Sequence, residues 1–162
     1  MHLSLLRGLI FIVAVGLLGT TSSGQKAKKN SAKTTTPTVL FVCEHGAAKS
    51  ILAATYFNKM AGEKNLRFTA IARGTHPDTE VSLKTLAGLR KAGLTPTESI
   101  PIKLTQEDIQ SAQRVVSFCP LPEEYIQNAI VEQWEDVPPV SESYEDARDA
   151  IIEHLKKLIN KL

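Results

Sequence analysis

Short apolar runs alternate along this chain with longer stretches in which apolar residues recur every three to four positions. Val39–Val42 is a continuous apolar run, which is typical of a buried parallel strand. Leu66–Ala72 predicts a second strand, and Arg114–Phe118 predicts a third that is also buried.

The stretches between these runs have the period of an α-helix. Ser50–Met60 predicts a well-buried helix, and Gly62 is a natural stop for it. Residues 78–80 (DTE) offer the start of a second helix, and Thr105 is suited to cap a short third one. The chain closes with a helix from about Ser141 to Ile159. Prolines bracket an irregular region before it: Pro120, Pro122, Pro138 and Pro139.

Strands that alternate with helices predict an α/β domain, in which a parallel sheet carries helices on both faces. Ligands of such sheets bind at the carboxyl ends of the strands. Cys43 and Cys119, the two cysteines of the chain, both fall at predicted strand carboxyl ends. We therefore expect the two thiols to lie at the same edge of the sheet.

The segment Cys43–Ser50 (CEHGAAKS) combines a thiol with small residues, a lysine and a serine. It leads directly into a predicted helix, whose first N–H groups and dipole favour negative charge. Such a position favours the thiolate form of a cysteine and a bound oxyanion. We expect a cysteine nucleophile beside an anion-binding loop. The alternative is a buried cysteine followed by an ordinary strand-to-helix turn.

The first 36 residues differ from the rest. Arg7 precedes an apolar run over residues 8–18, which is shorter than the roughly 20 residues that span a bilayer. Residues 1–24 are therefore interpreted as a signal peptide for export to a periplasm or medium, with an uncleaved membrane anchor as the alternative. Residues 25–36 hold four lysines and no large apolar side chain, which predicts a disordered linker.

The positive charge of the chain belongs to this N-terminal part. The whole sequence has 19 basic and 17 acidic residues, a net charge of +2. Five of the basic residues precede residue 37, which leaves 14 against 17 and a net charge of −3 for residues 37–162. We expect one monomeric domain there, with no nucleic-acid binding and with membrane contact only through an uncleaved N-terminal segment.

Four stretches, in order, carry a resemblance: TVLFVCEHGAAKS (38–50), ARGTHP (72–77), VVSFC (115–119) and WEDVPP (134–139). They resemble the phosphate loop, the SAGTHP stretch, the VVTLC strand and the Trp-x-x-x-Asp-Pro loop of the low-molecular-weight protein tyrosine phosphatase (phosphotyrosine protein phosphatase I) and thioredoxin-coupled arsenate reductase family. The loops of the arsenate-reductase-like branch often read Cys-x-His-Asn-x-x-Arg-Ser. Gly46 stands here for the Asn, and Lys49 for the Arg.

The resemblance implies a three-layer sandwich around a mainly four-stranded parallel sheet. It implies that Cys43 attacks phosphorus or arsenic and that Ser50 donates a hydrogen bond to the thiolate. Lys49 lacks the planar fork of arginine, so anion binding should survive better than stabilisation of the transition state. His45 is also a candidate local base, with a structural or solvated loop histidine as the alternative. The resemblance assigns oxyanion binding to six loop residues: Glu44, His45, Gly46, Ala47, Ala48 and Lys49.

The stretch 134–139 departs from the acid loop of the family, in which the phosphatases use an aspartate before proline to protonate the leaving oxygen. The matching position here is Pro138, which has no proton to donate. Asp136 could substitute for the acid if the loop shifts, and a solvated turn is its alternative role. General acid catalysis contributes about 10²–10⁴-fold, so weak activity on aryl phosphates is expected without another acid.

Cys119 matches, by its context, the first redox cysteine of the arsenate reductases, which attacks the nucleophile to form a disulfide. The third cysteine of that mechanism has no counterpart. Cys119 is otherwise a buried packing residue, or the partner of Cys43 in a stable disulfide in an oxidising compartment. The four histidines show no ligand spacing with the cysteines, so neither a metal nor a cofactor is expected.

Three functions follow from these residues. The first is an exported phosphatase that hydrolyses phosphomonoesters, such as protein phosphotyrosine, through a cysteinyl-phosphate on Cys43. The second is an arsenate-reductase-like redox enzyme that uses Cys43 and Cys119. The third is a catalytically impaired anion-binding or interaction module, as Lys49 and Pro138 together suggest. Phosphate, arsenate or a phosphorylated substrate is the expected ligand.

Overall fold

The computed structural model describes residues 36–127 and 129–162, so the interpretations of residues 1–24 and of the linker up to residue 35 lie outside the described residues. In chain order, the elements are β1 (Thr38–Cys43), α1 (Lys49–Glu63), β2 (Thr69–Gly74), α2 (Leu83–Lys91), α3 (Gln106–Ser111), β3 (Arg114–Ser117), α4 (Glu123–Ile126), β4 (Val131–Gln133) and α5 (Tyr144–Ile159).

The four strands form one parallel sheet in the order β2-β1-β3-β4. β1 lies in the middle, pairing with β2 from Thr38 opposite Thr69 and with β3 from Val39 opposite Arg114. The predicted α/β class and four-stranded parallel sheet are therefore confirmed. Because all strands run in one direction, their carboxyl ends, including Cys43, meet at one edge of the sheet.

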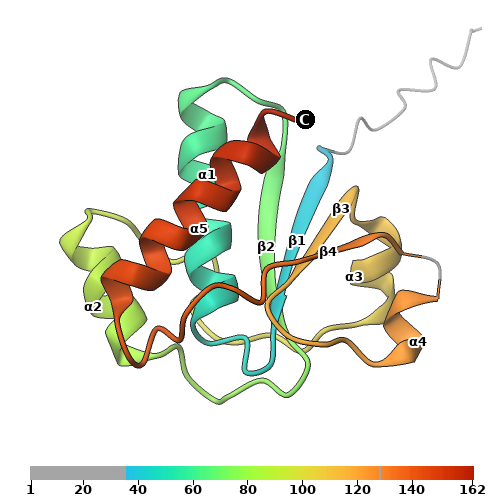
Figure 1. The fold of residues 1–162 in the computed structure, drawn as a ribbon, viewed down its shortest axis with the longest axis horizontal. Helices are drawn as coiled ribbons and strands as arrows, with labels where there is room; N and C mark the ends of the chain where they lie inside the picture. Colours follow the sequence, from blue (N-terminus) through green and yellow to red (C-terminus); the bar gives the residue numbers. More distant parts are fainter. Residues whose placement is uncertain (1–35, 128) are drawn as a thin grey trace, which may run out of the picture. The chain divides into compact units, whose positions relative to one another are not determined.

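Two layers of helices cover the sheet, as Figure 1 shows. Alternate residues of β1 point to opposite faces. Val39, Phe41 and Cys43 join the buried cluster that contains α1 and α5, whereas Leu40 and Val42 join a second cluster with Ile109 of α3. Every one of these β1 side chains is at least 94% buried, so the sheet is the central layer of a sandwich.

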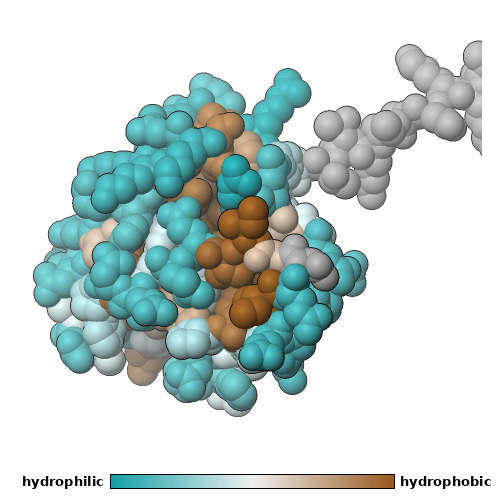
Figure 2. Space-filling model, turned by 45° about the vertical axis from the view of Figure 1, so that its right-hand side comes forward, coloured by the Kyte–Doolittle hydropathy of each residue, from teal (hydrophilic) through white to brown (hydrophobic). Residues whose placement is uncertain are grey.

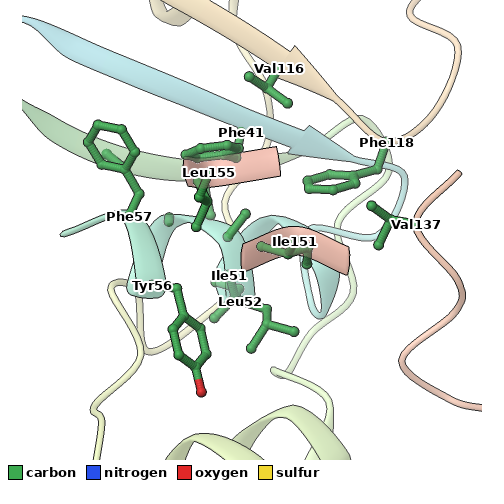
Figure 3. Close-up of a cluster of buried hydrophobic side chains, with 14 of the residues drawn as sticks. Phe41, Ile51, Leu52, Tyr56, Phe57, Val116, Phe118, Val137, Ile151 and Leu155 are labelled. Carbon is green, nitrogen blue, oxygen red and sulfur yellow. The ribbon is translucent and has the colours of Figure 1, made fainter. Parts of the chain in front are cut away.

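The larger core cluster leads toward the carboxyl edge of the sheet. Phe41 packs against Phe57 and Trp134, with ring centroids 6.0 and 5.7 Å apart. Trp134 also contacts Phe118 edge-on at 5.7 Å and stacks on His154 at 4.6 Å. Figure 3 shows Phe118 beside Val137 near the end of β1, beyond the aliphatic residues of α1 and α5. This packing fixes the segment that follows β4.

Two predicted boundaries are corrected by local backbone geometry. The second strand begins at Thr69 rather than Leu66, because Asn65 adopts a left-handed φ of 53° and the chain has to turn before it extends. The first helix runs through Gly62 to Glu63. The left-handed residue after the helix is therefore Asn65, and not the expected glycine.

The other helix boundaries follow from capping side chains. The second helix does not start at residues 78–80, since Ser82 caps it by accepting a hydrogen bond from Thr85 N–H at 3.4 Å. The last helix starts at Tyr144 rather than Ser141, because Ser143 accepts from Asp146 N–H at 3.1 Å. Thr105 caps α3 as predicted, in a capping box with Asp108.

The predicted irregular region contains two short elements that the sequence pattern missed, α4 and β4. β4 has three residues, and it is placed by its parallel pairing with β3, where Val115 lies opposite Val131. Three residues are too few to show an alternating pattern in the sequence, so β4 can be identified as a strand only by its pairing with β3.

The outer edge of β2 is closed along its length. The carboxamide of Asn58 accepts from Ala70 N–H at 2.7 Å and donates to the Ala70 carbonyl at 3.0 Å. Ala72 N–H donates to Glu98, and the Ala72 carbonyl accepts from Arg73 Nη1, both at 2.8 Å. Gly74 exchanges two backbone hydrogen bonds of 2.8 Å with residues 102 and 104. All outward N–H and C=O groups of the three residues are thus bonded.

Polar side chains cover most of the face in Figure 2, and a hydrophobic strip interrupts them. Among the described residues, no helix combines the length and apolar character needed to cross a membrane. A cavity of about 510 Å³ lies at the amino end of β3, beside Arg114, Tyr125 and Ile130. None of the predicted site residues lines it. It lies at the amino ends of the strands, whereas Cys43 is at a carboxyl end, so it carries none of the expected chemistry.

Candidate functional site

The site is built around Cys43, the last residue of β1, whose side chain is buried at the base of a cavity of about 320 Å³. Its Sγ lies 3.1 Å from the Oγ of Ser50, which is fully buried in the first turn of α1. A hydroxyl at this distance can donate a hydrogen bond to a thiolate. The structure thus brings together the two side chains that the resemblance paired.

The loop after Cys43 turns its carbonyl groups outward. Those of Cys43, Glu44, His45 and Ala47 accept hydrogen bonds of 2.8–3.2 Å from backbone N–H groups of residues 75–82. No described peptide bond is cis, and in a trans peptide the C=O and N–H groups point in opposite directions. The N–H groups of the next residues in each case, 44, 45, 46 and 48, therefore point to the inside of the loop.

These inward N–H groups have no backbone acceptor of their own: within residues 36–127 and 129–162, none of the four donates to a backbone carbonyl. Ala48 precedes α1 without a side-chain cap, and the first turn of this helix contains no acidic residue. The partial positive charge of the helix N-terminus is therefore also directed at the loop. Four free donors and a helix end are the features that bind a phosphate-like oxyanion.

Two glycines lock the loop to the sheet. Gly46 has φ of 60°, a left-handed conformation that glycine adopts freely and asparagine tolerates. This explains why glycine can stand where the family often has asparagine. A Cβ on Gly46 would lie 2.9 Å from Gly74 N, and one on Gly74 would lie 2.7 Å from Gly46 N. The two backbones therefore touch directly, which neither residue could allow with a side chain.

Lys49 is held at the cavity wall. Its ammonium donates a hydrogen bond to the Val137 carbonyl at 3.1 Å and lies 5.7 Å from the centroid of the Phe118 ring. The lysine thereby connects the start of α1 to the segment after β4. An ammonium carries three donors, so the contact with Val137 leaves others for an oxyanion in the cavity.

Cys119 lines the same cavity as Cys43, as expected from its place after β3. Burial raises the pKa of the Cys119 thiol, although a hydrogen bond with Ser117, at 3.8 Å between Oγ and Sγ, opposes this shift. Both cysteines are free thiols, so the structure does not contain the stable disulfide that was one of the alternatives. Cys119 also faces a neighbouring cavity, beside His76 and Pro120.

Comparisons with known proteins bear on this geometry. No protein-family profile matches the chain. An arsenate reductase from Archaeoglobus fulgidus superposes with a TM-score of 0.62 and 25% identity, over 75% of this chain and 98% of its own. A low-molecular-weight protein tyrosine phosphatase from T. tengcongensis superposes with a TM-score of 0.63 and 19% identity, over 78% and 99%. An arsenate reductase in its phosphate-binding state gives 0.64 and 20%, over 77% and 98%.

The chain has the fold of these phosphatases and arsenate reductases. The resemblance seen in four short stretches is therefore confirmed at the level of the fold, and so is the three-layer sandwich it implied.

The position of Asp136 does not fit the role of a substitute acid. Its carboxylate is 70% exposed and pairs with Nε2 of His154 at 2.9 Å. This hydrogen bond lowers the pKa of Asp136, which keeps the group ionised, and the residue does not line the Cys43 cavity. Pro138 lies two residues on, at the family's acid position, and cannot donate a proton.

A different carboxylate lines the cavity. Asp78 Oδ1 lies 3.3 Å from Nδ1 of His45, and both side chains are more than half exposed. Sequence reasoning missed Asp78 as a site residue because it read residues 78–80 as a helix start. The signal that could have found it is its place just after the stretch ARGTHP, which wraps the nucleophile loop.

Proposed function

We propose that this protein binds phosphate-like oxyanions in the loop Cys43–Ser50 and hydrolyses phosphomonoesters, such as protein phosphotyrosine, through a cysteinyl-phosphate. The observation that carries the proposal is a loop of four N–H donors, left without a backbone acceptor in the described part of the chain by the outward bonding of the carbonyls, next to a thiol with Ser50 Oγ at 3.1 Å. Preorganised donors of this kind stabilise charge that develops in a transition state. The phosphatases that share the fold support the reaction class.

The chemistry proceeds in two steps. The Cys43 thiolate attacks phosphorus, so that an S–P bond forms while the bond to the leaving oxygen breaks and that oxygen takes up a proton. Water then attacks phosphorus, the S–P bond breaks, and the thiolate is regenerated with the release of inorganic phosphate. The loop N–H groups hold the three non-bridging oxygens throughout, and Ser50 donates to the thiolate when it is free.

Lys49 sets the expected level of activity. An ammonium neutralises an anion as a point charge, whereas the guanidinium of the family binds two oxygens at once. One hydrogen bond of the Lys49 ammonium is also already made, to the Val137 carbonyl. We therefore expect Lys49 to support the binding of an oxyanion better than its turnover. Binding without turnover would identify the protein as an anion-binding module.

The test measures oxyanion binding and hydrolysis on the same protein. Phosphate should slow the alkylation of Cys43 by iodoacetamide, relative to chloride at equal ionic strength, and Cys119→Ser should keep this protection. Hydrolysis of 4-nitrophenyl phosphate should disappear in Cys43→Ser. Acid quenching during turnover should trap a phosphate on the Cys43 peptide, visible by mass spectrometry. Turnover that survives in Cys43→Ser would exclude the proposed nucleophile.

Reduction of arsenate is the second candidate, favoured by the presence of free Cys43 and Cys119 in one cavity. The Cys43 thiolate would form an S–As bond with arsenate, with loss of water. The Cys119 thiolate would then attack the Cys43 sulfur, so that the S–S bond forms while the S–As bond breaks. The electron pair of the S–As bond stays on arsenic, which leaves as trivalent arsenite. Thiol counting before and after arsenate separates the candidates. Two free thiols in both samples would exclude this reaction.

We also propose that the protein is exported, on the sequence of residues 1–24 alone. Arg7, the short apolar run and the small residues after it are the features of a signal peptide. N-terminal sequencing of protein from the native host should find a chain that begins near residue 25. An intact N-terminus in the membrane fraction would instead support the anchor.

A further inference from the structure

The proposed reaction needs a proton at the leaving oxygen, and the acid loop does not supply it. Pro138 occupies the expected position, and the Asp136 carboxylate is bonded to His154. Among the described residues that line the Cys43 cavity, the acidic or imidazole side chains are those of Glu44, His45 and Asp78. With the Lys49 ammonium and the Cys119 thiol, which line the same cavity, these are the titratable side chains near Cys43 from which a proton donor can come.

His45 and Asp78 are connected twice. The Asp78 N–H donates to the His45 carbonyl at 3.0 Å, and Asp78 Oδ1 lies 3.3 Å from His45 Nδ1. The backbone bond places Asp78 beside the loop whatever the side chain of residue 45 is. The side-chain contact is an ion-pair approach, through which the Asp78 carboxylate can hold the imidazole by its Nδ1 side beside the cavity.

A second carboxylate also lies near the imidazole. Glu44 Oε2 is 3.8 Å from His45 Nε2, and Lys49 and the two thiols line the same cavity. The imidazole lines the same cavity as the Cys43 thiol and belongs to a residue only two positions along the loop from it.

We infer that His45 is the catalytic acid of this site and that Asp78 is the residue that positions it. This inference rests on the proposed phosphomonoester hydrolysis. As the P–O bond breaks, His45 Nε2 gives its proton to the leaving oxygen. In the second step the neutral imidazole takes a proton from the water that attacks the cysteinyl-phosphate. The imidazolium returns, and no proton is gained or lost by the enzyme over the cycle.

The test compares two leaving groups on the full-length protein. Phenoxide is a poor leaving group that needs a proton, whereas 2,4-dinitrophenoxide leaves readily without one. His45→Gln should lower kcat/KM for phenyl phosphate by about 10² or more and change it little for 2,4-dinitrophenyl phosphate. Asp78→Asn should shift activity in the same selective way, and Asp78→Glu should restore part of the phenyl phosphate activity.

His76→Gln is the matched control, because His76 is exposed, contacts Thr75 at 3.2 Å and does not line the Cys43 cavity. It should leave both substrates unaffected. Equal losses on both substrates in His45→Gln would overturn the inference and leave the proposed function standing. Absence of Cys43-dependent turnover of 2,4-dinitrophenyl phosphate in the unaltered protein would overturn both.

Discussion

Replacing Gly74 by alanine should displace the nucleophile loop without disturbing the core. The new Cβ would lie 2.7 Å from Gly46 N and 2.9 Å from Gly46 Cα, whereas ordinary contacts begin at 3.4 Å. The atoms it meets are backbone atoms, which have no rotamer to move. The loop and β2 would therefore have to separate by about 0.7 Å.

The loss of unfolding free energy in Gly74→Ala follows from the hydrogen bonds that cross this contact. Thr75 N–H to the Cys43 carbonyl, at 3.2 Å, and His76 N–H to the Glu44 carbonyl, at 2.8 Å, adjoin the two glycines. A further 0.7 Å lengthens them to about 3.9 and 3.5 Å, so the first is lost and the second is left at the limit of hydrogen-bond range. One bond lost and one weakened, at about 1 kcal/mol for a full bond, with residual crowding of about 1 kcal/mol, give a loss of roughly 2–3 kcal/mol of unfolding free energy.

Urea denaturation measures this loss, and protection of Cys43 from alkylation by phosphate measures the state of the loop. Gly74→Ala should lose both stability and protection. Gly62→Ala is the control, because its Cβ would meet nothing within 4 Å on helix α1. It should stabilise the protein by about 0.5–1 kcal/mol. A Gly74→Ala protein with unchanged stability and full protection would refute the close packing of the two glycines.

Three further changes test other parts of the structure. Lys49→Arg should raise turnover of 4-nitrophenyl phosphate, since a guanidinium can bind two oxygens; an unchanged rate would show that charge alone matters. Thr105→Ala should cost about 1 kcal/mol in urea denaturation, because it removes the cap of α3; no loss would contradict the capping box. Burial raises the pKa of Glu98 above its ordinary value of 4.5, against the lowering effects of the Ala72 N–H and Arg73. Its ionisation therefore destabilises the fold as pH rises through the raised pKa. Glu98→Gln should then stabilise the protein at pH 7, with the gain shrinking toward pH 4, and a gain that is constant with pH would exclude this cause.

The strands and the position of Cys43 could be predicted because they depend on local pattern. The run Val39–Val42 is apolar at every position, as a strand buried on both faces requires. The rule that ligands bind at the carboxyl ends of parallel strands also predicted correctly that Cys119 lies near Cys43. The capping box at Thr105 is likewise a signal contained within four residues.

The parts that were missed depend on contacts between distant segments. Residues 75–82 contain helix-starting residues, and in the structure their N–H groups bond to the carbonyls of the nucleophile loop instead. The role of Asp78 follows only from that pairing. The exposed position of Asp136 is set by His154, 18 residues away on α5, and the sequence alone does not reveal such a partner.

The closed outer edge of β2 has a consequence for association between molecules. A free strand edge is a template onto which another chain can add a strand, which is a common start of aggregation. Asn58 imitates a neighbouring peptide group at Ala70, and Glu98, Arg73 and residues 102–104 occupy the rest of the edge. An incoming strand would have to displace bonds that are already made. On this side, the sheet of a folded molecule is therefore protected from growing into a fibre.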